Sequence, residues 1–343
     1  MFKLKDIIRE NILSLQPYSS ARDEFKGNAG VFLDANENPF GELNRYPDPY
    51  QRALKLKLSE LKKIPSDQIF IGNGSDEIID LTFRIFCNPN KDKALTFTPT
   101  YGMYDVSAAI NAIELIKVPL TAEFQIDLNL VEYFLSDSTL KVIFICSPNN
   151  PTANIFEKEK IEYLLKKFNG IIFIDEAYID FSDSESWIKM LTKYPNLMVS
   201  QTFSKAWGLA AARVGITYAN EEIIKLFNNV KLPYNVSDLN QKAALNALSN
   251  ADFFKKNLQI IKTEKQKLIE ALKTLTQVVK IYPSDANFLL VEVTDANKIY
   301  SELVSRKIIT RNRNALVKNC LRITIGTPEE NAILLQTIKN LSL

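Results

Sequence analysis

Histidine is absent from this 343-residue sequence, and cysteine is scarce. Without histidine there can be no Ser-His-Asp triad, Cys-His dyad or histidine-ligated metal, so a lysine amine becomes the natural proton carrier. The cysteines Cys87, Cys146 and Cys320 are widely spaced and form no C-x-x-C pair. We expect reduced packing thiols, and neither a disulfide framework nor a metal site.

A strong charge imbalance and long apolar runs are also missing. The 42 basic and 40 acidic residues leave a net charge of +2, which gives no reason to expect nucleic acid or an anionic membrane as partner. No apolar run approaches membrane-spanning length, and residues 1–10 interleave charged and apolar side chains, unlike a signal peptide. We expect a cytoplasmic protein, and the 46% hydrophobic content suffices for two domains.

Three apolar strands predicted in the middle of the chain each end in polar residues. In α/β sheets the carboxyl ends of the strands border the crevice in which ligands bind, so we expect these polar side chains to meet there. The strands are predicted at 142–146, 171–174 and 197–202, and the polar residues that follow them are Asn150, Asp175 with Tyr178, and Lys205.

These side chains suit pyridoxal phosphate chemistry. That cofactor needs a lysine amine to hold it, and Lys205 follows a strand in an otherwise apolar, small-residue turn, although a solvated lysine is the alternative when it is taken alone. The cofactor also needs a carboxylate that keeps its ring nitrogen protonated, and Asp175 would be costly to bury without such a partner. Tyr178 and Asn150 would face the ring hydroxyl.

A phosphate-binding set is predicted beside them. Thr202, Ser204 and Arg213 offer hydroxyls and a planar guanidinium for phosphate oxygens. Ser75 and Asp76 open a helical pattern, so their backbone amides would lie at a helix N-terminus, where anions bind. Asp76 fits the role of N-terminal cap equally well.

Eight motifs, taken in order and spacing, carry a family resemblance over nearly the whole chain. They occupy residues 33–39, 45–48, 72–77, 99–104, 147–152, 175–178, 204–213 and 321–326. With them the sequence resembles the fold-type I, aspartate-aminotransferase-like enzymes, and within these the histidinol-phosphate aminotransferases. One departure is Ala153, where these families usually carry glycine, so the geometry of this turn is open.

The resemblance implies an α/β architecture with a large, doubly wound, mostly parallel sheet domain and a smaller α+β domain. We expect an N-terminal helix and arm at 1–40 that packs with the small domain, a large cofactor-binding domain at 41–235, and a connecting helix with the small C-terminal domain at 236–343. It also implies a homodimer with shared active sites, in which Tyr46 reaches the cofactor phosphate of the neighbouring subunit.

Further roles are implied by the same resemblance. Tyr101 would stack on the cofactor ring, with a core tyrosine as the alternative. Arg322 would bind the α-carboxylate of glutamate. Arg311 would hold an acidic substrate group, but Arg313 lies two residues away, on the same face if this is a strand, and the register is open. Further substrate-side positions are Tyr18 and Asn36.

The resemblance implies a pyridoxal 5'-phosphate-dependent aminotransferase that interconverts histidinol phosphate and 2-oxoglutarate with imidazole-acetol phosphate and glutamate. Three alternatives stay open at this point. An aromatic or broad-range amino acid aminotransferase would share the same core motifs, and a phosphothreonine decarboxylase would share the fold. A non-enzymatic cofactor-binding regulator is disfavoured, because the full catalytic set is present.

Overall fold

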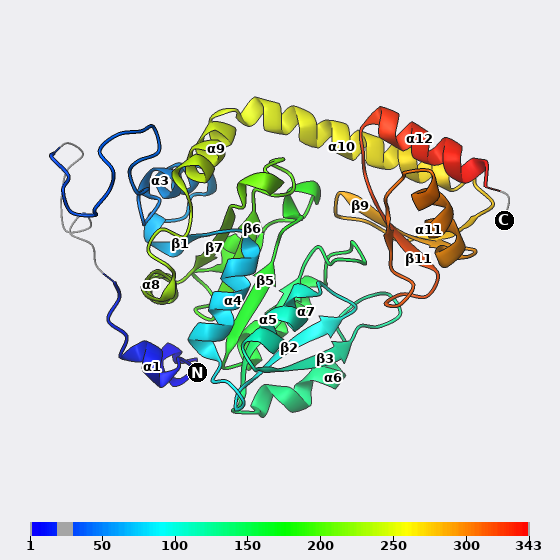
Figure 1. Ribbon diagram of the computed structural model, residues 1–343. Coiled ribbons are helices and arrows are strands. Elements are labelled where there is room, and N and C mark those ends of the chain that lie inside the picture. The colour runs from blue at the N-terminus through cyan, green and yellow to red at the C-terminus, as the bar shows by residue number, and fades with distance from the viewer. Residues whose placement is uncertain (1, 19–29, 342–343) are drawn as a thin grey trace.

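The computed structural model describes residues 2–18 and 30–341, and its strands form two sheets connected through a long helix (Figure 1). The seven-stranded sheet has the order β1-β7-β6-β5-β4-β2-β3. Its strands are β1 Ile69–Gly72, β2 Lys93–Thr98, β3 Glu114–Pro119, β4 Leu140–Cys146, β5 Ile171–Asp175, β6 Leu197–Thr202 and β7 Gly215–Ala219. The four-stranded sheet, in the order β10-β11-β9-β8, contains β8 Val278–Ile281, β9 Phe288–Val293, β10 Arg311–Asn312 and β11 Cys320–Thr324.

Helices surround both sheets. The α-helices are α1 Glu10–Leu13, α3 Arg52–Lys62, α4 Ser75–Phe86, α5 Met103–Ile110, α6 Leu128–Val131, α7 Lys158–Lys167, α8 Glu221–Val230, α9 Asp238–Ser249, α10 Ala251–Leu272, α11 Ala296–Ser305 and α12 Pro328–Lys339. Short 3-10 helices are η1 Leu4–Asp6, η2 Ser66–Gln68, η3 Glu132–Ser136, η4 Ile179–Phe181, η5 Trp187–Met190 and η6 Ala210–Ala212. Within the described residues, no helix combines the length and the apolar character needed to cross a membrane.

The large sheet is mostly parallel, as expected. Strands β2 to β6 pair in parallel, and β7 runs antiparallel to both of its neighbours, β6 and β1. Helices α3, α7 and α9 pack on one face, and α4, α5 and α8 pack on the other. Because both faces are covered, β5 and most of β4 are continuous apolar runs, and this is why they could be recognised in the sequence. The predicted strand 197–202 matches β6, and the predicted strands 142–146 and 171–174 lie within β4 and β5.

Two packing features differ from the expected domain layout. The N-terminal helix was expected against the small domain, but Ile7 and Ile12 pack in the core on the α4 side of the large sheet, and the Arg9 amide donates to the Ile85 carbonyl. Helix α9 follows the predicted boundary at residue 235, yet its apolar residues pack on the opposite face of the same sheet. In both cases the apolar face of the helix is buried by the large sheet.

The two faces of the small sheet have different surroundings. Leu321 and Ile323 of β11 point into a core formed with α10, α11 and α12. Side chains alternate along a strand, so Arg322 between them points to the opposite face, away from that core. Helix α10 runs from α9 to this second unit across the top of Figure 1.

Candidate active site

The carboxyl ends of β4, β5 and β6 form one edge of a small cavity. Neighbouring parallel strands place Cys146 beside Asp175, and Asp175 beside Ser200. Most of the residues predicted to bind the cofactor therefore line the same cavity. Its lining consists of Ser75, Asp76, Tyr101, Cys146, Asn150, Asp175, Ala177, Tyr178, Thr202, Ser204, Lys205 and Arg213.

Asp175 is a buried carboxylate held by two hydrogen-bond donors. The Tyr104 hydroxyl donates to Asp175 Oδ2 at 3.0 Å, and the Ala177 amide donates to Oδ1 at 3.1 Å. Burial raises the pKa of Asp175 from 3.8 to about 6, and the two hydrogen bonds oppose this rise because they favour the charged form. A positively charged partner in the cavity would further stabilise the ionised carboxylate.

Lys205 brings an amine to the same cavity from the turn after β6. Its Nζ atom lies 5.6 Å from the centroid of the Tyr178 ring. Solvent reaches the side chain, but partial burial of the amine lowers the pKa of Lys205, and the Arg322 cation lowers it further, while Asp175 acts in the opposite direction. A lowered pKa increases the neutral fraction of the amine, which is the nucleophilic form.

Asn150 and Arg322 connect the two sheets across the cavity. Arg322 Nη1 donates to Asn150 Oδ1 at 2.6 Å, and Asn150 Nδ2 donates to the Tyr178 hydroxyl at 3.5 Å. Burial raises the pKa of Tyr178, so its hydroxyl stays protonated and can donate a hydrogen bond. The guanidinium carbon of Arg322 also lies 5.3 Å from the ring centroid of Phe288. The predicted carboxylate-binding arginine therefore borders the cavity.

The other end of the cavity contains an anion site at the start of α4. Gly74 is the N-cap and provides no side-chain cap, so Asp76 lies in the first helical turn and is not the cap. The Asp76 carboxylate accepts a hydrogen bond from the Tyr101 hydroxyl at 3.0 Å and lies 3.4 Å from Arg213 Nη2. Backbone amides at an uncapped helix start, next to a guanidinium, can bind a phosphate group.

Close backbone packing supports this anion site. Gly74 has φ +78°, and an added Cβ would lie 2.6 Å from Arg213 Nη2, so only glycine leaves room for the guanidinium. The Ser204 amide donates to Thr202 Oγ1 at 3.1 Å, which shapes the turn between β6 and Lys205. The cavity thus offers a phosphate site, a buried carboxylate and a lysine amine, and this donor set fits pyridoxal phosphate.

The turn that carries Asn150 keeps a glycine-like conformation without glycine. Ala153 has φ +68° and is fully buried. Its amide donates to the Asn149 carbonyl, and its carbonyl accepts from the Asp285 amide, both at 2.8 Å. A left-handed alanine costs about 1–2 kcal/mol, which these hydrogen bonds and the surrounding packing offset. The departure at Ala153 therefore leaves the turn geometry intact.

Besides Arg322, four predicted residues do not line the cavity in this single chain, and one of them is Arg311, which is exposed on β10. Tyr18 is 67% exposed. Asn36 and Tyr46 line a separate pocket beside Tyr234, whose ring stacks on Tyr46 with the centroids 4.4 Å apart. Their predicted roles at the cofactor or substrate remain predictions.

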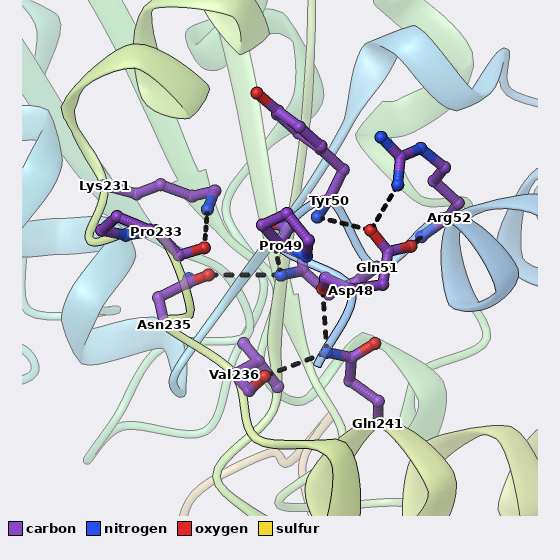
Figure 2. Close-up of polar contacts among 10 residues, drawn as sticks. All are labelled: Asp48, Pro49, Tyr50, Gln51, Arg52, Lys231, Pro233, Asn235, Val236 and Gln241. Carbon is purple, nitrogen blue, oxygen red and sulfur yellow. Dashed lines mark hydrogen bonds and ion pairs between the residues drawn. The ribbon is translucent and has the colours of Figure 1, made fainter. Parts of the chain in front are cut away.

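A polar network fixes the segment that follows Tyr46, as Figure 2 shows. Gln51 Nε2 donates to Asn235 Oδ1 at 3.3 Å, and Gln241 Nε2 donates to the Asp48 carbonyl at 3.2 Å. The Lys231 amine donates to the Pro233 carbonyl at 2.7 Å. These contacts hold the start of α3 against the 231–241 segment, which includes Tyr234.

Whole-chain comparisons decide the family. Residues 21–338 match the family model described as Aminotransferase class I and II. The chain belongs to the class I and II aminotransferases. This aminotransferase is 52% identical over 345 residues to the histidinol-phosphate aminotransferase of Christiangramia forsetii, with 99% of this chain and 98% of that protein covered. It is 50% identical to the enzyme of the same name from Flavobacterium psychrophilum, with 99% of each chain covered.

A solved structure agrees with the fold of this aminotransferase. The histidinol-phosphate aminotransferase from Clostridium acetobutylicum superposes with a TM-score of 0.79 at 26% identity, covering 87% of this chain and 90% of that one. The shared architecture confirms the predicted fold class.

Sequence reasoning missed one contact of Asp175 and left the register of two arginines open. Tyr104 contacts Asp175, although it reads as an ordinary core tyrosine in a helical pattern; its spacing of three from Tyr101 was the available signal. Arg313 was noted only as an uncertainty in register. The structure pairs Arg311 with Arg322 across β10 and β11, and the Arg313 amide donates to the Cys320 carbonyl at 2.9 Å, so Arg311 and Arg313 face the same side.

Proposed function

We propose that this aminotransferase is a cytoplasmic, pyridoxal 5'-phosphate-dependent histidinol-phosphate aminotransferase. It interconverts histidinol phosphate and 2-oxoglutarate with imidazole-acetol phosphate and glutamate. Full-length similarity to enzymes of that name supports the reaction. The structural observation that carries the proposal is one cavity with Lys205, Asp175 and the start of α4 around it and Arg322 at its border.

Each residue of the cavity would have a separate role in the reaction. When bound, the cofactor supplies the electron sink that makes the α-hydrogen of the amino substrate acidic. Asp175 would keep the proton on the ring nitrogen through a charge-assisted hydrogen bond, and Tyr178 with Asn150 would hydrogen-bond the ring oxygen. The Lys205 amine would take the proton from the substrate α-carbon as general base and then donate a proton as general acid. Arg322 holds the carboxylate of glutamate by its planar fork.

Cofactor anchoring belongs to a separate set of residues. The amides of Ser75 and Asp76, the Ser204 hydroxyl and the Arg213 guanidinium would hold the phosphate, and Tyr101 would cover the ring face. Rigid anchoring at the phosphate leaves Lys205 free to move its proton without losing the cofactor.

A second copy of the chain completes the site in this proposal. Tyr46 lines a pocket that shares no residue with the Lys205 cavity, which fits a role toward the partner subunit's cofactor phosphate. The arm before it exposes large apolar side chains: Val31 is 88% exposed, Leu33 89% and Phe40 82%. Burying such side chains against another subunit would stabilise a homodimer.

Separate half-reactions test the function. The absorbance spectrum of the cofactor-loaded protein is recorded before and after adding histidinol phosphate, glutamate or phenylalanine without an oxo acid. We expect histidinol phosphate and glutamate each to convert the cofactor to its amine form. A response to phenylalanine and glutamate but not to histidinol phosphate would instead indicate an aromatic aminotransferase. Carbon dioxide released from phosphothreonine without an acceptor would indicate a decarboxylase.

The Lys205→Ala variant tests the proton carrier. It should abolish turnover and still retain some cofactor, because the phosphate and ring contacts remain. Lys255→Ala is the matched control, since Lys255 is an exposed lysine paired only with Asp252 at the surface. Near-normal turnover in the Lys205 variant would refute its assignment.

A further inference from the structure

Three arginines lie on one face of the small sheet. Arg311 and Arg322 are directly opposite each other in the antiparallel pair of β10 and β11. Arg313 continues the same ladder, because its amide donates to the Cys320 carbonyl, two residues before Arg322. Residues two apart on a strand point to one side, so all three guanidinium groups start from the face opposite the Leu321 core.

The Arg313 side chain is partly buried near other charged and polar groups. Burial is the main reason that the pKa of Arg313 falls to about 10. The charges of Arg322 and Arg311 lower this pKa further, and Tyr178 acts in the opposite direction. Tyr178 lines the Lys205 cavity. Arg313 shares a sheet face with Arg322, and Arg322 contacts this cavity through Asn150.

The three arginines are not paired with carboxylates in the part of the chain that the structure describes. Across residues 2–18 and 30–341, none of the three arginines forms an ion pair, and Arg322 donates to the neutral amide of Asn150. Arg313 Nε is buried and makes no hydrogen bond. Clustered cations and a buried unpaired donor both carry a free-energy cost, which an anionic ligand would remove.

The number of arginines favours one kind of anion. A carboxylate presents two oxygens and is satisfied by one bidentate guanidinium. A phosphate monoester near pH 8 carries two charges on three terminal oxygens, so it can engage a third arginine that a carboxylate leaves unused. We propose that Arg313 is a specificity-determining residue that binds the substrate's phosphate, while Arg311 and Arg322 serve the phosphorylated substrate and glutamate alike. This inference rests on the proposed function.

The test compares two ligands that cannot react because they lack an amine: glycerol 3-phosphate and glutarate. Their dissociation constants are measured by calorimetry on the cofactor-loaded protein at pH 8. Arg313→Gln should weaken glycerol 3-phosphate roughly 10- to 100-fold, the range for a lost charge-assisted hydrogen bond, and leave glutarate nearly unchanged. Arg313→Lys keeps the charge but loses the planar guanidinium, so its affinity for glycerol 3-phosphate should lie between those of Arg313→Gln and the unaltered protein.

A surface arginine provides the matched control. Arg306→Gln also removes one positive charge, from an exposed side chain that pairs with Glu302 on α11, and it should alter neither ligand. In the half-reactions, Arg313→Gln should raise KM for histidinol phosphate with little change in kcat and little change for glutamate. Thermal melting of each variant verifies that it is folded.

The results that would contradict the role of Arg313 can be distinguished from those that would contradict the proposed function. Equal weakening of both ligands by Arg313→Gln, or no weakening of glycerol 3-phosphate, overturns the role of Arg313 while the proposed function stands. If the unaltered protein reacts with glutamate but neither reacts with histidinol phosphate nor binds glycerol 3-phosphate, the proposed function itself fails, and the role of Arg313 fails with it.

Discussion

The hydroxyl of Tyr104 lies 3.0 Å from Oδ2 of Asp175 and joins α5 to the carboxyl end of β5. Tyr104 is fully buried, and its ring stacks on Phe144 with the centroids 5.0 Å apart. The phenol is thus held in place by packing and by one strong acceptor. A buried carboxylate depends on such donors to stay ionised, so Tyr104 supports the electrostatic role of Asp175 without touching the substrate side of the cavity.

Replacing Tyr104 with phenylalanine should shift the pH range over which the cofactor binds. The hydroxyl favours the ionised carboxylate, so its removal should raise the pKa of Asp175 above its value of about 6. A charge-assisted hydrogen bond corresponds to about one to two pH units. Cofactor affinity, which needs the ionised form, should therefore begin to fall at a higher pH in the variant. Fluorescence titration of the cofactor-free protein between pH 5 and pH 9 measures this onset.

Tyr133→Phe is the matched control, because Tyr133 is 83% exposed on η3. It should leave the onset where it is. An unchanged onset in Tyr104→Phe, with normal affinity, would show that the Ala177 amide alone suffices to keep Asp175 ionised.

Asp175→Asn should stabilise the cofactor-free protein while removing its activity. The folded-state pKa of Asp175, about 6, lies above the ordinary value of 3.8, so the ionised side chain costs stability above pH 6, and this cost disappears as the pH falls toward 3.8. The difference between these two pKa values corresponds to roughly 3 kcal/mol. Asparagine carries no charge, and its Oδ1 can still accept from the Ala177 amide while its Nδ2 donates to the Tyr104 hydroxyl oxygen. The variant should therefore melt at a higher temperature at pH 8, with a smaller advantage at pH 5.

Asp252→Asn controls for the change of residue type, since Asp252 is almost completely exposed. Its melting temperature should differ little from that of the parent at either pH. A lower melting temperature for Asp175→Asn at pH 8 would contradict the destabilising role of the buried charge.

The cavity could be predicted because its residues follow strands with a strong local signal. Asp175 ends an apolar run and Lys205 follows β6 in a short turn, and parallel strands bring their carboxyl ends to one edge of a sheet. Local patterns of this kind can be recognised from the sequence alone. The position of Arg322 on the face opposite Leu321 and Ile323 has the same origin, because alternation along a strand is itself a sequence pattern.

The remaining features depend on contacts between distant segments. Tyr104 meets a residue 71 positions away, and no local property separates it from a core tyrosine. Ala153 adopts φ +68° only because its turn is fixed by residues as remote as Asp285. The place of the N-terminal helix was mispredicted for the same reason, since its short apolar stripe fits either domain. The role of Tyr46 involves a second chain and stays a prediction.

Gly215→Ala should weaken cofactor binding without replacing any polar side chain of the site. Gly215 begins β7 next to the start of α4, and an added Cβ would lie 2.5 Å from the Gly74 carbonyl carbon and the Ser75 amide nitrogen. Backbone atoms on both sides cannot yield as a flexible side chain would, so the methyl group should displace the first turn of α4 and misalign the amides that face the phosphate. Overpacking of this kind costs about 1–3 kcal/mol.

Gly102→Ala is the control, because Gly102 has helical dihedral angles and an added Cβ there meets no atom within 4 Å. Equilibrium titration of both variants with pyridoxal phosphate should show a loss of roughly 5- to 100-fold for the first and none for the second. Equal affinities would show that α4 can shift without cost and that the phosphate site does not depend on this contact.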